Sequence, residues 1–255
     1  MKIATWNVNS LRVRLPHVLN WLGQERPDVL AVQETKMTDP EFPVAELAEA
    51  GYRSVYSGQK TYNGVAVLSK LDPCDPITDP ADFDDPQRRI LAVTVADCRI
   101  VNLYVPNGGE VGSDKYAYKL NWLAKMRNCL RLELERHPRL VVLGDFNIAP
   151  EDRDVYDPES WREKILCSTP EREAFRALLD LGLTDAFRRF DQAEKSYTWW
   201  DYRLNAFRRN LGLRIDHILV SAPLAEDCLA CRIDVEPRKL ERPSDHAPVV
   251  AEFRA

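Results

Sequence analysis

Short apolar runs alternate with amphipathic segments along the whole chain. The clearest run is Leu140–Leu143, four apolar residues followed by a glycine, and this length is typical of a strand buried on both faces. Similar patterns predict further strands at residues 2–7, 29–32, 52–57, 64–69, 89–95, 99–105, 213–220, 233–236 and 249–253. The pattern therefore predicts a sheet-rich protein built from many short strands.

Four segments have the spacing of amphipathic helices. The longest, 113–135, places these apolar residues on one face: Tyr116, Leu120, Leu123, Met126, Leu130 and Leu134. Shorter helices are predicted at 15–24, 42–50 and 170–181, with Pro16 in a first turn and Gly182 as a C-terminal cap.

The connections between these elements bear on domain organisation. Residues 71–86 hold four prolines and six aspartates, which predicts an exposed loop. Helices and strands interleave with no linker or low-complexity segment between them. We therefore expect one domain, residues 1–255, with mixed and largely antiparallel sheets.

Composition is compatible with a sizeable core, because 45% of the residues are hydrophobic and six are tryptophan. No apolar run approaches the roughly 18 residues of a membrane span, and the N-terminus turns polar too early for a secretory signal. We expect a cytoplasmic protein with reduced thiols. Cys228 and Cys231 have C-x-x-C spacing, but neither a second pair nor a nearby histidine completes a zinc site, so packed cysteines are expected.

The charge balance gives a mixed indication about partners. A net charge of −5 argues mildly against a polyanionic partner. Residues 195–214, however, carry five cations and one acid, interleaved with tyrosine and tryptophan. This pattern favours a surface that follows phosphates and stacks bases, and the alternative is a solvated basic loop. Bulk charge does not decide between them.

Polar side chains follow the apolar runs where strands end. Asp145 and Asn147 are two residues apart after the run 140–143, so strand alternation would point both the same way. Unpaired buried charges are costly, and a hard divalent cation such as Mg²⁺ with oxygen ligands is one physical solution. The other strand-end residues are Asn7, Asn9, Glu34, Tyr104, Asn107, Asp216, Asp245 and His246.

Each of these residues also has an ordinary structural explanation. Glu34 could be a carboxylate at the start of a helix, and Asp245 with His246 could form a surface turn. Asp216 is harder to explain, because a lone aspartate is seldom tolerated inside an apolar strand. The joint occurrence favours a functional site over several separate accidents.

Seven motifs resemble those of the exonuclease III family, the abasic-site endonucleases of the endonuclease/exonuclease/phosphatase superfamily. They are WNVNSLR at 6–12, QETK at 33–36, YVPNG at 104–108, GDFNIAP at 144–150, YTWWDYR at 197–203, GLRID at 212–216 and PSDHAP at 243–248. The resemblance extends in order from residue 2 to residue 253. It implies a four-layer α/β sandwich, an α+β arrangement of two packed mixed sheets with helices outside and the site at one edge.

The same resemblance implies a reaction, a cofactor and a partner. A monomer would hydrolyse phosphodiesters in double-stranded DNA at abasic sites and at recessed or blocked 3′ ends, leaving 3′-hydroxyl groups. Glu34 would be the principal ligand of Mg²⁺, for which Mn²⁺ can substitute. The residues close to the ion would be Asn7, Asn9 and Asp245.

The implied catalytic residues act on water and on phosphate. Asp145, helped by Asn147, would orient or deprotonate the attacking water. His246, held by Asp216, would donate to a phosphate oxygen. The residues implied to hold the phosphate or the leaving group are Tyr104 and Asn107.

Further residues match the family's substrate contacts. Trp199, Leu213 and Ile215 correspond to the pocket for a flipped sugar without its base, and core packing is the alternative for the two aliphatic residues. Candidates for contacts to the DNA strands are Lys36, Arg88, Arg89, Arg203 and Arg208.

One loop departs from the family pattern. Residues 165–167 are Ile, Leu and Cys, which are bulkier than the small or polar residues expected there. If Leu166 crowds the pocket, internal cleavage would weaken and the enzyme would be mainly a 3′-end-processing exonuclease or phosphatase. Two other functions are less favoured: an inositol phosphate or lipid phosphatase, which the motifs at 199–203 and 212–216 disfavour, and a catalytically dead nucleic-acid-binding protein, which the intact catalytic set disfavours.

Overall fold

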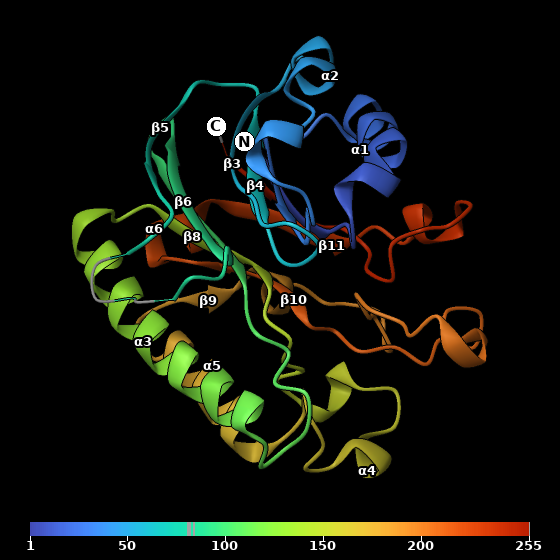
Figure 1. Ribbon diagram of the computed structural model, residues 1–255. Coiled ribbons are helices and arrows are strands. Elements are labelled where there is room, and N and C mark those ends of the chain that lie inside the picture. The colour runs from blue at the N-terminus through green and yellow to red at the C-terminus, as the bar shows by residue number, and fades with distance from the viewer. Residues whose placement is uncertain (81–82, 84, 255) are drawn as a thin grey trace.

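The structure is a computed structural model that describes residues 1–80, 83 and 85–254 (Figure 1). Two six-stranded sheets pack face to face, and helices cover the outer face of each sheet. Both sheets are mixed, and most neighbouring strands in them are antiparallel. The predicted four-layer α/β sandwich is therefore confirmed.

The first sheet has the strand order β11-β12-β1-β2-β4-β3. Strands β1 and β2 run parallel, which brings their C-terminal ends to the same edge. Helices α1 and α2 lie on the outer side of this sheet (Figure 1). The elements are β1 Lys2–Asn7, α1 Leu11–Glu25, β2 Val29–Gln33, α2 Val44–Glu49, β3 Arg53–Ser57, β4 Val65–Ser69, β11 Cys228–Ile233 and β12 Val249–Phe253.

The second sheet has the order β5-β6-β7-β8-β10-β9. Its parallel pair is β7 with β8, and helices α3 and α5 lie side by side on its outer face (Figure 1). The elements are β5 Pro73–Ile77, β6 Ile90–Val95, β7 Cys98–Tyr104, α3 Asp114–Arg136, β8 Leu140–Asp145, α5 Thr169–Leu179, β9 Thr184–Asp185 and β10 Asp216–Val220. The remaining helices are α4 Pro158–Trp161, α6 Ala222–Asp227 and the 3-10 turns η1 Asp39–Glu41, η2 Asp152–Asp154, η3 Ala186–Arg189, η4 Arg203–Asn205 and η5 Glu236–Lys239.

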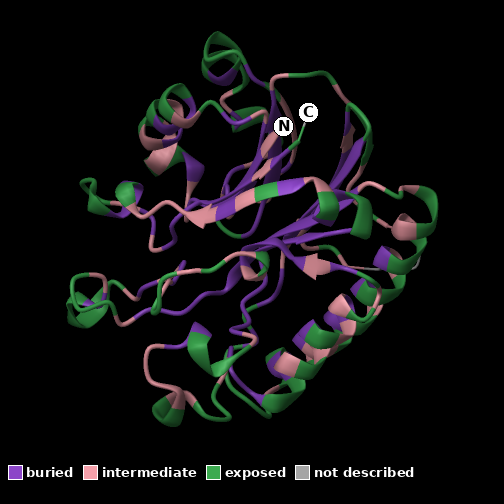
Figure 2. Ribbon diagram, turned by 180° about the vertical axis from the view of Figure 1, so that it is seen from behind, coloured by how far each residue is buried: buried purple, intermediate pink, exposed green. Residues whose placement is uncertain are grey.

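Strand alternation divides the core into three layers. In β8, Val141 and Leu143 face the other sheet, whereas Leu140 and Val142 face α3 and α5. The third layer packs α1 against the first sheet. Figure 2 shows the central strands almost entirely buried and the helices buried mainly on their inner sides. A strand with both faces covered is apolar throughout, which explains the continuous runs in the sequence.

A polar bridge crosses the apolar layer between the sheets. Gln33 Nε2 donates to Asn102 Oδ1 at 2.7 Å and to Thr5 Oγ1 at 2.9 Å. Asn102 Nδ2 donates to the carbonyls of Val32 at 3.0 Å and Ala66 at 2.9 Å. The bridge thus joins β1, β2 and β4 of one sheet to β7 of the other through fully buried side chains.

The first helix differs from the prediction at its start. It begins at Leu11 rather than at residue 15, so Pro16 lies inside the helix and not in its first turn. Leu11 is buried and extends the apolar face that Val18 and Leu22 continue, which favours the earlier start.

Two predicted segments near sheet edges are corrected. Residues 73–77 form β5 rather than a loop, and this edge strand accommodates two prolines because an edge needs fewer ladder donors. Residues 81, 82 and 84 of the predicted loop lie outside the described residues. The predicted strand at 233–236 is wrong, since β11 ends at Ile233 and a 3-10 turn begins at Glu236.

Other expectations hold in part. Cys228 and Cys231 are buried free thiols in β11, as predicted. Along α3, Leu120 and Leu134 are only half-buried, and Lys119 is buried on the inner face instead. No helix among the described residues has both the length and the apolar character needed to cross a membrane.

Candidate active site

The polar strand ends of both sheets meet at one edge of the sandwich. Asn7 ends β1 and Gln33 ends β2 in the first sheet, while Tyr104 ends β7 and Asp145 ends β8 in the second. Asp216 begins β10 and lies opposite Asp145 in the antiparallel register. The two parallel pairs therefore deliver most of the predicted site residues to the same place.

Asn7 connects carboxylates from the two sheets. Its Nδ2 donates to Glu34 Oε1 and to Asp145 Oδ2, each at 2.9 Å. The other oxygen of Glu34 lies 2.8 Å from Lys36 Nζ. Glu34 itself follows β2 with a left-handed backbone, φ 55°, which turns the chain away from the sheet at this point.

His246 and Asp216 form a hydrogen-bonded pair that also spans the two sheets. His246 Nδ1 lies 2.8 Å from Asp216 Oδ2, and Nε2 lies 3.8 Å from Asp145 Oδ2. His246 precedes β12 of the first sheet, whereas both aspartates belong to the second. A carboxylate beside Nδ1 fixes the ring orientation and leaves Nε2 aimed at the centre of the cluster.

The buried charges of this cluster influence one another. Burial opposes the charged form of His246, but the carboxylates of Asp216, Asp145 and Asp245 outweigh it and raise the pKa of His246. Burial also raises the pKa of Asp145, and the neighbouring Asp216 charge acts in the same direction. The arrangement thus holds a cationic imidazole beside a carboxyl group that binds a proton more readily than usual.

A left-handed turn, rather than strand alternation, places Asn147. Asn147 has φ 50°, and its backbone N–H donates to Asp145 Oδ1 at 2.9 Å. Its Nδ2 donates to the Val105 carbonyl at 3.0 Å, and its Oδ1 accepts from Asn107 Nδ2 at 3.1 Å. The expected proximity of Asp145 and Asn147 is found, but through this turn.

Tyr104 ends β7 opposite Asp145 of β8, and the charges of Glu34 and Asp145 both act on it. Burial raises the pKa of Tyr104 well above its usual value, and the charges of the two carboxylates raise it further. The Arg89 guanidinium lies over the ring, 4.6 Å from its centroid. The hydroxyl therefore remains a protonated donor across the neutral range.

Asp245 and Asn9 form a second hydrogen-bonded group, next to the cluster of Glu34, Asp145 and His246. Asp245 accepts from Asn9 Nδ2 and from Trp199 Nε1, each at 2.9 Å. These donors and the charge of His246 outweigh burial and lower the pKa of Asp245. Asn9 Oδ1 in turn accepts from Lys36, so Lys36 connects this group to Glu34.

The carboxylates at the centre fit a metal ion. Ligand atoms of Glu34, Asp145 and His246 all lie within 4.8 Å of one another. Two carboxylates with neighbouring amides form an oxygen-rich donor set, which suits a hard cation such as Mg²⁺ better than zinc. Of the four residues predicted to surround the ion, Glu34 is in this group and Asn7 contacts it. Asn9 and Asp245 are hydrogen-bonded to each other, and Lys36 connects Asn9 to Glu34.

An apolar cluster forms a wall next to the charged group. Leu213 and Ile215 are buried in it, and Trp199 packs against it and pairs with His246 in an isolated β-bridge. Leu166 belongs to the same cluster and is 4% exposed. The three predicted pocket residues are thus brought together, with Leu166 among them.

The candidate DNA contacts differ in their surroundings. Lys36 lies inside the charged cluster, whereas Arg88 is at the surface and pairs with Asp79 at 3.0 Å. Arg203 is exposed and pairs with Asp201.

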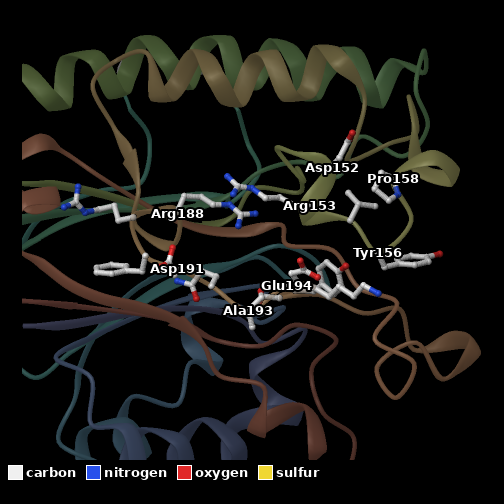
Figure 3. Close-up of a pocket in the computed structure, with 15 residues that line it drawn as sticks. Asp152, Arg153, Tyr156, Pro158, Arg188, Asp191, Ala193 and Glu194 are labelled. Carbon is white, nitrogen blue, oxygen red and sulfur yellow. The ribbon is translucent and has the colours of Figure 1, made fainter.

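A cavity of about 860 Å³ lies between residues 152–158 and residues 188–197 (Figure 3). Its lining mixes cations and acids, including Arg153, Arg188, Asp152 and Glu194. None of the predicted catalytic or metal-binding residues lines it. The chemistry of the strand ends, and not cavity volume, therefore identifies the candidate site.

Two buried ionic groups behind the site were missed by the sequence reasoning. Arg214 is paired with Asp154 and Asp185, and its Nη1 lies 3.0 Å from His217 Nδ1. The second group is Lys119 with Glu171. The signals available were cationic residues within apolar patterns: Arg214 inside the run 213–220, and Lys119 on the buried face of the long helix.

Comparisons with known proteins agree with this geometry. Residues 4–246 match the profile of the Endonuclease/Exonuclease/phosphatase family. The chain is 37% identical to Exodeoxyribonuclease III of Haemophilus influenzae, covering 100% of both chains. Among solved structures, it resembles the 3′ phosphatase NExo from Neisseria bound to a product DNA hairpin, with a TM-score of 0.98, 53% identity and 100% of both chains covered. An AP endonuclease from Archaeoglobus fulgidus gives a TM-score of 0.96 with 40% identity, again over 100% of both chains.

Proposed function

Because this chain belongs to the Endonuclease/Exonuclease/phosphatase family, as a nuclease of the exonuclease III and AP endonuclease type, we propose a specific reaction for it. It hydrolyses phosphodiesters in double-stranded DNA at abasic sites and at 3′ ends, depends on Mg²⁺ and leaves 3′-hydroxyl groups. The observation that carries the proposal is the continuous contact from Glu34 through Asn7 to Asp145, with the His246–Asp216 pair beside it.

Each group has a role in an in-line displacement. Asp145, whose pKa burial raises, accepts the proton of the attacking water as a new P–O bond forms and the bond to the 3′ oxygen breaks. The His246 imidazolium, oriented by Asp216, donates from Nε2 to a phosphate oxygen. Tyr104 donates its hydroxyl proton to the phosphate or the leaving oxygen.

The amide side chains complete the phosphate site. Asn147 and Asn107 are bonded to each other and place further donors beside Asp145. Glu34 would hold the metal, with Asn7, Asn9 and Asp245 around it. When bound, Mg²⁺ supplies positive charge that offsets the negative charge developing on the phosphoryl oxygens.

The apolar wall supports an abasic substrate. A pocket of Trp199, Leu213 and Ile215 excludes a polar base and accepts a bare sugar, which costs little to unstack. We further propose that residues 1–255 form one domain acting as a monomer. The single domain is supported by the hydrogen bond of Asn7 with Asp145, which joins the two sheets at the site.

A second candidate function is 3′-end processing with weak internal cleavage. Leu166 is buried in the pocket cluster and has φ 73°, an unusual backbone for leucine. A relative with 53% identity is described as a 3′ phosphatase. Glycine tolerates this backbone, so Leu166→Gly should open the pocket without strain and raise incision at internal abasic sites. Equal internal incision by the wild type and Leu166→Gly would refute the crowding.

One cleavage assay tests both candidates. A labelled duplex with one internal abasic analogue and a matched duplex with a recessed 3′ end are incubated with Mg²⁺ or with EDTA. Magnesium-dependent incision at the internal site supports the first function, and digestion only from the 3′ end supports the second. His246→Gln controls for contaminating nuclease. Activity that persists in EDTA, or no cleavage of either duplex, would contradict the proposal.

A further inference from the structure

A fully buried lysine lies directly behind the proposed phosphate site. Lys119, in the first half of α3, has 0% of its side chain exposed. Its Nζ donates to the Asn147 carbonyl at 2.6 Å and to the Asn107 carbonyl at 3.1 Å. The side chains of the same two asparagines are bonded to each other. One ammonium group therefore holds the backbones of two turns whose side chains face the site.

Glu171, the ion-pair partner of Lys119, contacts a third segment, residues 166–168. Glu171, also 0% exposed, lies in the first turn of α5 and is bonded to Lys119 through Oε1. The same oxygen accepts the Leu166 N–H at 3.1 Å. Its Oε2 accepts the N–H of Ser168 at 3.1 Å and the hydroxyl at 2.6 Å, which caps the helix. The carboxylate thus fixes the backbone of the pocket residue Leu166.

Close packing reinforces these polar contacts. A Cβ at Gly108 would lie 2.9 Å from Ile165 and 3.0 Å from Lys119, so this turn closes tightly on both. The Leu166 carbonyl accepts the Ala149 N–H at 2.8 Å. The segments 107–108, 147–149 and 165–168 therefore converge on a single buried ion pair.

Stability alone does not account for such a pair. Desolvating two charges costs about as much as their attraction returns, and an apolar pair of similar volume is commonly as stable. Burial lowers the pKa of Lys119 against the opposing charge of Glu171, which shows that the desolvation is substantial. What an apolar pair could not supply is the set of directed bonds to three backbone segments.

We propose that Lys119 and Glu171 are positioning residues, which hold Asn107, Asn147 and the pocket residue Leu166 in one mutual arrangement. This inference rests on the proposed function and deepens it. The ion pair contacts no substrate. It acts through the two asparagines and through the loop that forms the pocket wall, so it couples the fit of the sugar to the placement of the phosphate donors.

The test separates positioning from folding. Lys119→Met leaves a buried carboxylate unpaired and should lower both the melting temperature and kcat. The double variant Lys119→Met/Glu171→Gln removes both charges, so most of the melting temperature should return. Its kcat on the recessed 3′ end should stay about tenfold to a hundredfold below wild type with KM nearly unchanged, because the asparagine carbonyls still lack their donor. Recovery of kcat together with stability would overturn the proposal.

A mostly buried ion pair, in which Glu133 is 14% exposed, provides the control. Arg99 is 1% exposed and pairs with Glu133 at 2.7 Å, near the opposite end of β7 from Tyr104. Arg99→Met/Glu133→Gln should leave kcat unchanged at 25 °C even if it lowers the melting temperature. An equal loss of kcat in both doubles would overturn positioning by Lys119.

Two further measurements complete the test: the kcat of Glu171→Gln and the cleavage activity of the wild type. If the methionine variants do not fold, Glu171→Gln is decisive, because it keeps the side-chain shape while weakening the bonds to Lys119 and Leu166. It should lower kcat without changing KM, and an unchanged kcat would overturn the proposal. Failure of the proposed function itself is distinguishable, because the wild type would then cleave neither duplex.

Discussion

The buried histidine His217 should make the stability of the protein depend on pH in a defined way. Its Nε2 bonds to the Ile148 carbonyl at 2.9 Å, and its Nδ1 lies 3.0 Å from Arg214 Nη1. The Arg214 guanidinium carries only N–H donors and cannot accept a hydrogen bond, so Nδ1 is the acceptor, Nε2 carries the proton donated to Ile148, and the ring is neutral. The groups facing it are Arg214, Asp185 and Asp154.

The size and sign of the effect follow from this environment. Burial, with the Arg214 charge in support, lowers the pKa of His217 from 6.5 to about 4. The unfolded chain therefore binds a proton at a higher pH than the folded protein does. The contribution is fully present above pH 6.5 and decreases as the pH falls towards 4. At about 1.4 kcal/mol per pKa unit, the loss reaches about 3 kcal/mol.

Urea unfolding of wild type and His217→Leu at pH 8, 7, 6 and 5 measures this contribution. The variant should be less stable at pH 8, because two buried hydrogen bonds are lost, by about 1–3 kcal/mol. Between pH 6 and pH 5 its free energy of unfolding should fall less steeply than that of wild type. The difference between the two slopes should approach about 1.4 kcal/mol per pH unit, which corresponds to one proton bound on unfolding. Parallel curves for wild type and His217→Leu would refute the reasoning.

Three further predictions concern the site and its support. Glu34→Gln should raise the Mg²⁺ concentration for half-maximal cleavage at least about tenfold, and an unchanged metal titration would contradict its role as ligand. Asp216→Asn removes the carboxylate beside His246 Nδ1 and should lower kcat about a hundredfold, measured under saturating substrate; normal turnover would exclude the role assigned to the pair. Gly144→Ala would put a Cβ 1.9 Å from the Leu103 carbonyl oxygen at φ 140°, so unfolding should show a loss of at least about 2 kcal/mol, and a variant of wild-type stability would contradict this geometry.

Local patterns in the sequence predict much of this architecture. The run 140–143 indicates a doubly covered strand because alternate residues face two apolar layers, and both layers are found. The polar strand ends predict a common site because unpaired buried charges are costly. The structure shows how they meet, since the parallel pairs β1–β2 and β7–β8 bring their ends to one edge. Pro73 and Pro76 misled the prediction for β5, since proline is compatible with an edge strand but typical of a loop.

Long-range partners were beyond those patterns. Asp145 meets Asn7 across 138 residues, and nothing in either strand specifies the other. The motif resemblance supplied the candidate site residues but not the groups that support them. Lys119 could have been flagged as a polar residue on a buried helix face, yet its partners come from three segments that only the folded chain brings together.

The polar bridge between the sheets has a consequence for catalysis. Gln33 directly precedes Glu34, and Asn102 lies two residues before Tyr104, so the bridge sits immediately behind the site. Sliding one sheet over the other by a single residue would displace the two halves of the site by about 3.3 Å, further than any hydrogen bond tolerates. Apolar faces resist such slip weakly because their contacts are non-directional. Activity therefore depends on the alignment of the two sheets that the bridge fixes. If the bridge is broken, activity should be lost under conditions in which the protein is still folded.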